Sequence, residues 1–144
     1  MKLKRYFTVS PDSGLQTLAT FHMCHTSALP LLVNLGMMGS LGSYLCKTRG
    51  TGAFTQLLAM GAIGATLAVT ADARSNPDQV QAGSLGLSAT MITYAAFRAP
   101  GYFAMWRFSP LTMVAATLGY GMMYDDKAIV GGVAAGYAAF LMAL

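Results

Sequence analysis

Apolar stretches of 17 to 20 residues alternate with short polar segments over most of the chain. The stretches cover residues 28–46, 52–71, 82–99, 108–124 and 128–144. An α-helix needs roughly 20 mainly apolar residues to cross a hydrocarbon core about 30 Å thick, so each stretch is close to that length. The segments between them, among them KTRG, DARSNPDQ and DDK, carry charges and turn-forming residues. The pattern predicts an all-α integral membrane protein with about five transmembrane helices.

The chain before the first apolar stretch is polar, which predicts a surface arm. Its segment SPDSG is typical of a turn, and LQTLATFHM has the spacing of a helix that lies on a membrane surface. Between the third and fourth stretches, YFAMWRF combines aromatic rings with a cation, as membrane interfaces do. The residues expected at membrane–water interfaces are His22, His25, Trp106 and Arg107. The predicted organisation is an N-terminal arm over residues 1–20 and one transmembrane domain over residues 21–144.

Composition excludes several classes of protein. Of the 144 residues, 55% are hydrophobic and 10% are charged, with a mean hydropathy of +0.52, which a water-soluble domain could not solvate. The net charge is +4, but the basic residues are scattered through loops without interleaved aromatics, which argues against nucleic acid as a partner. There is no glutamate, and the five aspartates fall in predicted loops or the N-terminal segment. With no carboxylate at membrane depth, an ion-coupled transporter is not expected.

Charges differ between the two predicted sides of the membrane. The loops after the first and third stretches hold four cations and no acid: Lys47, Arg49, Arg98 and Arg107. The other side holds all five aspartates and five cations, namely Lys2, Lys4, Arg5, Arg74 and Lys127. Counted as cations alone the two sides are close to even, but the short loops between helices weigh more than the N-terminal arm. We therefore expect the acid-free side, together with the C-terminus, to face the cytosol or matrix.

Glycines recur at helical spacing and are candidates for helix packing. In lipid no hydrophobic force drives helices together, so association depends on close backbone contact through small residues. The predicted packing positions are Gly36, Gly39, Gly61, Gly64, Gly83, Gly86, Gly132 and Gly136, of which the last two form a GxxxG pair. The eleven methionines follow no repeated spacing and are expected to fill gaps between helices.

The run FHMCHTS raises the question of a metal site, because two histidines flank Cys24. Three residues on one turn rarely converge on a single ion, and no fourth ligand is near in sequence, so no metal is predicted. Cys24 and Cys46 lie near opposite ends of the first predicted span, too far apart for a disulfide.

Three further motifs follow one another along the chain. HTSALPLLVNLG at residues 25–36 precedes Leu41-Gly42, SLGLSA at residues 84–89 contains Ser88, and AIVGGVAAG covers residues 128–136. Together they resemble rhomboid intramembrane proteases, with the helix that carries histidine and asparagine on one face, the GxSG nucleophile motif and the AHxGGxxxG segment of the general base. The resemblance extends from residue 22 onward. It implies a rhomboid-like bundle that lacks the first core helix of the family.

The chain departs from this family at three positions that serve one reaction. Ile129 stands where the resemblance implies the general-base histidine, and a serine hydroxyl without a base is a poor nucleophile. Pro30 replaces the oxyanion histidine and leaves Asn34 as the side-chain donor; losing one such donor costs about 10²–10³ in rate. Ala89 replaces the glycine after the serine. We therefore predict no enzyme activity, with Ser88, Asn34 and Ile129 as vestigial residues.

A bundle without the groups of a protease is expected to be a structural or accessory subunit of a larger membrane complex. The predicted host is a mitochondrial inner-membrane assembly, either of the respiratory chain or of ATP synthase. Other membrane subunits and lipids are the expected partners, and no cofactor is expected beyond a structural phospholipid. The alternative is a pseudoprotease that binds transmembrane substrates in a translocase or dislocation machinery. A third possibility is an active rhomboid serine protease with a base that the sequence hides.

Overall fold

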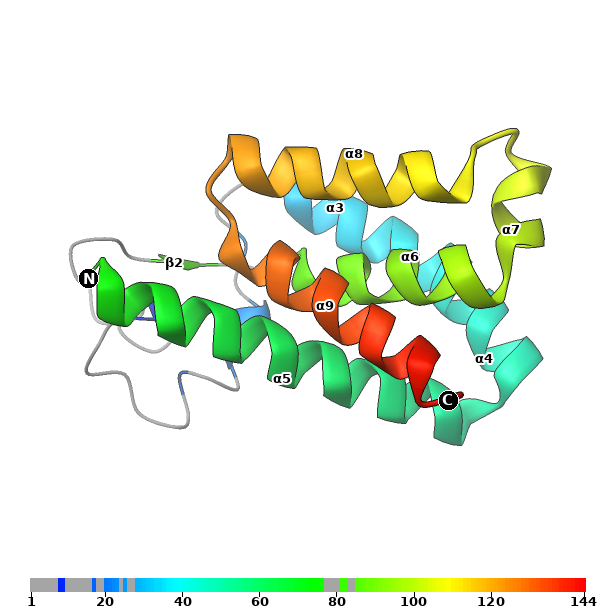
Figure 1. Cartoon of the computed structure of the whole chain (residues 1–144), viewed down its shortest axis with the longest axis horizontal. Helices are drawn as coiled ribbons and strands as arrows, with labels where there is room; N and C mark the ends of the chain where they lie inside the picture. Colours follow the sequence, from blue (N-terminus) through cyan, green and yellow to red (C-terminus); the bar gives the residue numbers. More distant parts are fainter. Residues whose placement is uncertain are drawn as a thin grey trace.

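Helices make up the computed structural model, apart from one short pair of strands (Figure 1). The structure describes residues 8–9, 17, 20–23, 25, 28–76, 81–82 and 85–144. Its helices are η1 (Phe21–Met23), α3 (Ala28–Met37), the π-helical turn η2 (Met38–Gly42), α4 (Ser43–Arg49), α5 (Thr51–Ser75), α6 (Gly86–Arg98), α7 (Pro100–Met105), α8 (Pro110–Met123) and α9 (Lys127–Leu141). Strands β1 (Thr8–Val9) and β2 (Gln81–Ala82) pair antiparallel, with Thr8 opposite Ala82 and Val9 opposite Gln81.

Each of the five apolar stretches corresponds to a helix or to a run of helices, so the all-helical prediction is confirmed. Two segments are long and apolar enough to cross a membrane, the run from Ala28 to Arg49 and α5. The helices α6, α8 and α9 have 13, 14 and 15 residues. At 1.5 Å per residue they are only about 20 to 23 Å long. Within the described residues, two of the five predicted spans therefore have full membrane length.

Local chemistry explains where several helices begin. Gly50 has φ +86°, a conformation that favours glycine, and it allows the sharp turn between α4 and α5. Pro100 and Pro110 occupy the first positions of α7 and α8, where a missing N–H costs nothing. Asp126 caps α9, because its Oδ1 accepts a hydrogen bond from the N–H of Ala128 at 3.0 Å.

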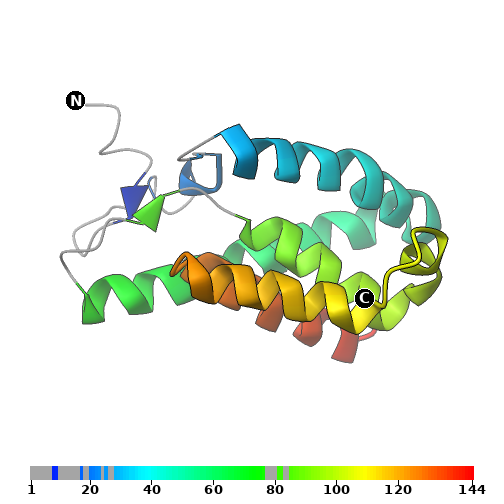
Figure 2. The ribbon, with the colours of Figure 1, turned by 90° about the horizontal axis from the view of Figure 1, so that it is seen from above.

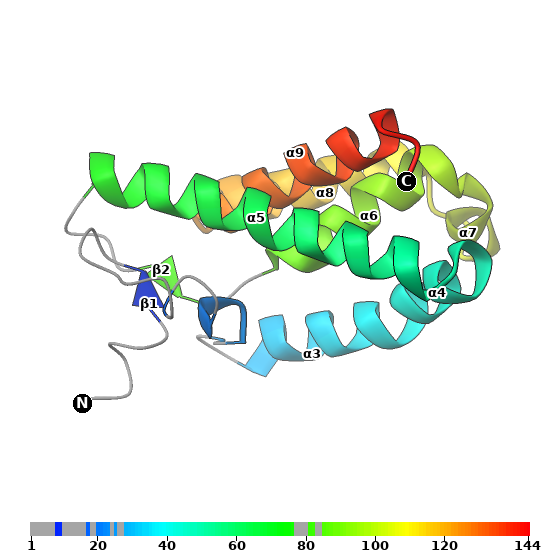
Figure 3. The same ribbon diagram turned by 90° about the horizontal axis from the view of Figure 1, so that it is seen from below.

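The central helix of the bundle is α6. Ten of its thirteen residues are buried, and it contacts α3, α5, α8 and α9. Its Thr90 hydroxyl donates to the carbonyl of Gly132 in α9 at 3.0 Å and to the carbonyl of Gly86 at 2.9 Å. By contrast, α3 has no buried residue and lies along the outer edge of the bundle (Figures 2 and 3).

Glycines allow α9 to approach both α5 and α6 closely. A Cβ added to Gly64 would lie 2.6 Å from the carbonyl oxygen of Gly131, and one added to Gly86 would lie 2.8 Å from that of Ala128. Neither helix pair could be this close if these positions carried a side chain. The predicted packing glycines at such contacts are Gly61, Gly64, Gly86, Gly132 and Gly136.

Gly36 and Gly39 differ from the packing prediction. A Cβ at either position would meet nothing within 4 Å in the described part of the chain, because both glycines lie on the exposed side of the first span. Gly83 lies outside the described residues.

The expected surface arm also differs from the structure where its residues are described. Val9 and Thr17 are buried, and Val9 shares an apolar cluster with Phe21 and with Val69 of α5. The pairing of β1 with β2 holds this segment beside the chain that leads into α6. The remaining residues of the predicted arm lie outside the described ranges.

Candidate functional site

A hydrogen-bonded chain of three side chains connects α6, α3 and the residue His25 before α3. The Ser88 hydroxyl, in the first turn of α6, donates to Oδ1 of Asn34. On the other side of the amide, Nδ2 of Asn34 lies 2.7 Å from Nε2 of His25. Ser88 is 2% exposed, so its hydroxyl needs a partner inside the protein, and Asn34 supplies it. The structure thus brings together three of the residues singled out from the sequence.

Among the described residues, the hydrogen-bond partner of the Ser88 hydroxyl is an amide and not a base. With the amide as described, Asn34 accepts from Ser88 and donates to His25. In the opposite amide orientation, Asn34 would donate to Ser88 and accept from the imidazole. In both cases an amide stands between the serine and the imidazole, and an amide oxygen does not take a proton from an alcohol. A serine needs an adjacent base to become a nucleophile, and the group bonded to Ser88 in the described structure is an amide.

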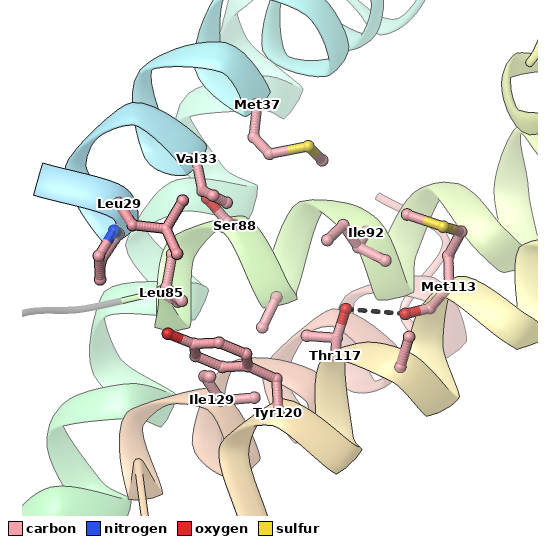
Figure 4. A pocket seen from close by; sticks show the side chains of 13 residues that line it. Leu29, Val33, Met37, Leu85, Ser88, Ile92, Met113, Thr117, Tyr120 and Ile129 are labelled. Atoms are coloured by element: carbon pink, nitrogen blue, oxygen red, sulfur yellow. Dashed lines mark hydrogen bonds between the residues drawn. The ribbon is translucent and has the colours of Figure 1, made fainter. Parts of the chain in front are cut away.

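A cavity of about 250 Å³ lies beside Ser88, between α3, α6, α8 and α9 (Figure 4). Its lining is almost wholly apolar. The residues that line it are Leu29, Pro30, Val33, Met37, Leu85, Ser88, Ala89, Ile92, Met113, Ala116, Thr117, Tyr120 and Ile129. An apolar cavity of this kind stays free of water and takes apolar ligands; one of about 150 Å³ is known to bind benzene.

The residues that depart from the protease pattern all border this cavity. Pro30 comes from α3, Ala89 from α6 and Ile129 from the first turn of α9. Figure 4 shows Ser88 on the α3 side of the cavity, with Ile129 and Tyr120 across from it. Ile129 is fully buried and packs with Leu85 and Ala89. The cavity wall across from Ser88 is therefore formed in part by a branched alkyl group.

Tyr120 is a lining residue that the sequence reasoning missed. Its ring packs against the cluster around Ile129, and it is the titratable side chain in the cavity wall. In the described structure the hydroxyl of Ser88 bonds to Asn34 rather than to this phenol. Spacing could not reveal this neighbour, because α8 reaches the cavity only through the tertiary packing of the bundle.

The two histidines form hydrogen bonds in different parts of the structure. His22 lies in η1, where its Nε2 is 3.1 Å from Oγ1 of Thr66 in α5 and its ring stacks on Phe21 at a centroid distance of 4.0 Å. Burial lowers the pKa of His22 below its ordinary value of 6.5, and a backbone hydrogen bond with Ala62 opposes this in part. His25 instead joins the chain to Ser88.

The described residues contain no cluster of three or more histidine, cysteine, aspartate or glutamate side chains that could hold a metal ion. Cys24 is outside the described ranges, and Cys46 is a free thiol 3.5 Å from the Thr51 hydroxyl. Trp106 and Arg107, predicted at an interface, are exposed at the turn between α7 and α8. Arg107 adopts φ +58°, an unfavourable value for a side-chain-bearing residue, which reverses the chain there.

The arrangement as a whole offers an apolar cavity and a hydrogen bond between α3 and α6. Compared with known proteins, the chain matches no family model, no curated protein and no solved structure. Its function therefore has to be argued from the geometry of its own residues.

Proposed function

We propose that this protein is a non-catalytic, rhomboid-like membrane bundle that serves as a structural subunit of a larger membrane complex. The observation that carries the proposal is the state of α3. Apart from Asn34 this helix is apolar, and none of its residues is fully buried against the rest of the described chain. Leu29, Leu32 and Leu35 are each more than 60% exposed, and Gly36 and Gly39 have open space beside them. A helix with such a face is well suited to pack against a helix of another subunit.

A membrane location is supported by the length and composition of the helices. The run from Ala28 to Arg49 and α5 can each cross a bilayer, and leucines, methionines and aromatics lie exposed on the outside of the bundle. In water such a surface would aggregate, whereas in lipid it is the expected exterior. The shorter α6, α8 and α9 complete the bundle in this proposal.

The rhomboid-like part of the proposal is supported by the grouping of residues around the cavity. Pro30, Ser88, Ala89 and Ile129 come from three helices and meet at one place, as the resemblance implies for residues of a former active site. The loss of catalysis is supported by the Ser88–Asn34 hydrogen bond and by the alkyl group of Ile129. We expect the cavity to hold a lipid chain, because its lining offers an apolar ligand nearly all of its contacts.

A mitochondrial inner-membrane complex, of the respiratory chain or ATP synthase, stays a prediction from the resemblance alone. The experiment that tests the subunit proposal is extraction of the chain from its own membranes in mild detergent, followed by sizing and stoichiometric mass spectrometry. We expect other membrane proteins at fixed ratios to the chain. A chain that migrates alone under the mildest extraction would contradict the proposal.

A double variant, Gly36→Leu with Gly39→Leu, sharpens this test. A Cβ at either position meets nothing within 4 Å in the described part of the chain, and leucine favours helix formation, so we expect folding to be preserved. The two leucine side chains would prevent a partner helix from approaching α3 closely. The partner proteins should therefore no longer copurify with the chain. Gly119→Leu, on α8 and also in open space, is the matched control and should retain them. Equal retention in both variants would exclude α3 as the contact surface.

The absence of catalysis has its own test. A serine-directed fluorophosphonate should not label Ser88, while an active rhomboid labelled in parallel serves as the control. Labelling of the wild type that disappears in Ser88→Ala would show an activated serine and would revive the protease reading.

The pseudoprotease alternative is favoured by one observation, the apolar cavity between α3 and α8. A photo-crosslinking amino acid in place of Val33, which lines the cavity, distinguishes the two functions. Crosslinks to one or two fixed subunits support the structural role, whereas crosslinks to many different transmembrane segments support substrate binding.

A further inference from the structure

One end of the bundle collects basic residues from three separate parts of the chain. α4 ends at Arg49, α6 ends at Arg98, and Arg107 follows α7, which lies at the same end as α4 (Figure 1). The basic residues at this end are Lys47, Arg49, Arg98 and Arg107, and all four are exposed. We call this set the basic end.

No aspartate of the described residues lies at the basic end, where Leu144 and the end of α9 also lie (Figure 1). The described acids are Asp72 in the last part of α5 and Asp125 and Asp126 in the turn between α8 and α9, at the opposite end of the helices. The ion pair within the described structure, between Lys127 and Asp125, also lies at that opposite end. Within the described residues, the four cations therefore have no aspartate beside them and form no ion pair.

The guanidinium group of Arg49 is held against the main chain of Arg98. A terminal nitrogen of Arg49 donates to the main-chain oxygen of Arg98 at 3.1 Å, although 49 positions separate the two residues in sequence. This contact has a structural value, because it satisfies a carbonyl at the end of α6 and places a cation at the negative end of the helix dipole. It uses one of the five guanidinium donors of Arg49, and the others remain available. The Arg49 guanidinium thus lies at the main chain of a second arginine, and arginines that gather without an aspartate are suited to bind an anion.

Aromatic and apolar side chains beside the basic end mark the level of the lipid headgroups. Met105, Trp106 and Phe108 are 68%, 61% and 55% exposed, on either side of Arg107. Exposed tryptophan next to arginine is typical of a membrane–water interface. In that setting the anion nearest to the two arginines is a lipid phosphate.

We propose that Arg49 and Arg98 bind the phosphodiester of an anionic phospholipid at the basic end. Guanidinium groups bind phosphate oxygens through paired N–H donors, which makes arginine suited to this ligand. Lys47 and Arg107 add charge at the same level and favour a lipid with net negative charge over a zwitterionic one. The inference rests on the membrane location in the proposed function, but not on the identity of any partner protein.

Native mass spectrometry and thermal unfolding of the full chain in detergent with added lipid test the inference. We expect phosphatidylglycerol to remain bound and to raise Tm, and phosphatidylcholine to do neither. The double variant Arg49→Gln with Arg98→Gln should weaken phosphatidylglycerol binding about 30-fold, the loss expected for two interfacial arginines. Arg74→Gln, an exposed arginine near the opposite end of α5, is the matched control and should bind as the wild type does.

A single variant, a phosphate control and a membrane wash distinguish the reasons for which the inference could be wrong. Arg98→Gln alone keeps the Arg49 contact with α6 and should still lose most of the binding, which preserves the test if the double variant unfolds. Equal phosphatidylglycerol retention in Arg98→Gln and wild type overturns the inference. If inorganic phosphate alone raises Tm as much as phosphatidylglycerol does, the bound anion need not be a lipid and the inference is wrong. Release of the chain from membranes by carbonate washing would instead contradict the proposed function itself.

Discussion

At the scale of single residues, the chain from Ser88 through Asn34 to His25 fixes three polar side chains at a place that is otherwise apolar. Asn34 lies in a helix with no buried residue, so its bonds to Ser88 and His25 help to hold α3 on the bundle. Interhelical hydrogen bonds of this kind contribute about 0.6 kcal/mol on average in membrane proteins. In the described structure these three side chains link α6, α3 and the segment before α3.

The sequence allowed part of this site to be predicted. The order of the motifs indicated that Ser88, Pro30 and Ile129 belong together, and the structure does place them around one cavity. The bond between His25 and Asn34 could not be predicted, because His25 precedes α3 and returns to it only through the local path of the chain. The burial of Val9 was missed for a similar reason, since it depends on a partner in α5 far along the sequence.

His22 gives the stability of the protein a pH dependence. Its pKa in the folded state is below the ordinary 6.5, so the unfolded state binds the proton more tightly. The free energy of unfolding is therefore highest above pH 6.5 and falls as the pH drops from there toward the lower folded-state pKa. We expect Tm in detergent to fall on acidification from about pH 7.5 to about pH 5.5.

The variant His22→Gln keeps a donor toward Thr66 without a group that titrates, and should show a flatter dependence over this range. Asp126 has the opposite effect on the pH dependence of stability. Burial raises its pKa above 3.8, so its contribution to stability declines as the pH rises from that value to its folded-state pKa. If the dependence of Tm on pH is unchanged in His22→Gln, groups other than His22 cause the effect.

At the scale of helices, the hydropathy pattern predicted which segments are helical but not all of their limits. α6 begins at Gly86 rather than at residue 82, because Gln81 and Ala82 pair with Thr8 and Val9 as strands. Such a long-range pairing leaves no trace in local hydropathy. The helix α7 was predicted only as an interfacial segment, although Pro100 provides a standard helix start.

The closeness of α5 and α9 predicts opposite effects for two glycine-to-alanine changes. In Gly64→Ala the new Cβ would meet the Gly131 carbonyl oxygen at 2.6 Å, which forces the helices apart and should cost roughly 1–3 kcal/mol. In Gly119→Ala the new Cβ meets nothing within 4 Å, and the better helix propensity of alanine should stabilise by up to about 1 kcal/mol. The free energy of unfolding, measured in mixed micelles, should fall in Gly64→Ala and rise in Gly119→Ala. Equal effects would contradict the close approach of α5 and α9.

At the scale of the whole molecule, the helices differ strongly in length. α5 has 25 residues, whereas α6, at the centre, has 13, a difference of about 18 Å at 1.5 Å per residue. A bilayer about 30 Å thick is well matched to the first and too thick for the second. In the proposed membrane location, the bilayer around α6, α8 and α9 has to thin or neighbouring proteins have to shield these helices.

This mismatch predicts a preference for thin bilayers. The isolated chain should unfold at a higher temperature in nanodiscs of dimyristoyl phosphatidylcholine than in nanodiscs of dierucoyl phosphatidylcholine, because thinner lipid reduces the cost of mismatch at the short helices. Bound partner subunits should reduce the difference by covering those helices. A higher unfolding temperature in the thicker bilayer would contradict this prediction and would favour a location of the short helices away from lipid.

The position of α9 in the chain has a consequence for biosynthesis. Its glycines complete the contacts with both α5 and α6, yet it is translated after them. In the proposed membrane location, the small-residue faces of α5 and α6 stay open until α9 has been synthesised and inserted. Insertion chaperones and quality-control proteases would encounter those faces, so the yield of mature protein should depend on how promptly translation proceeds through residues 127–141.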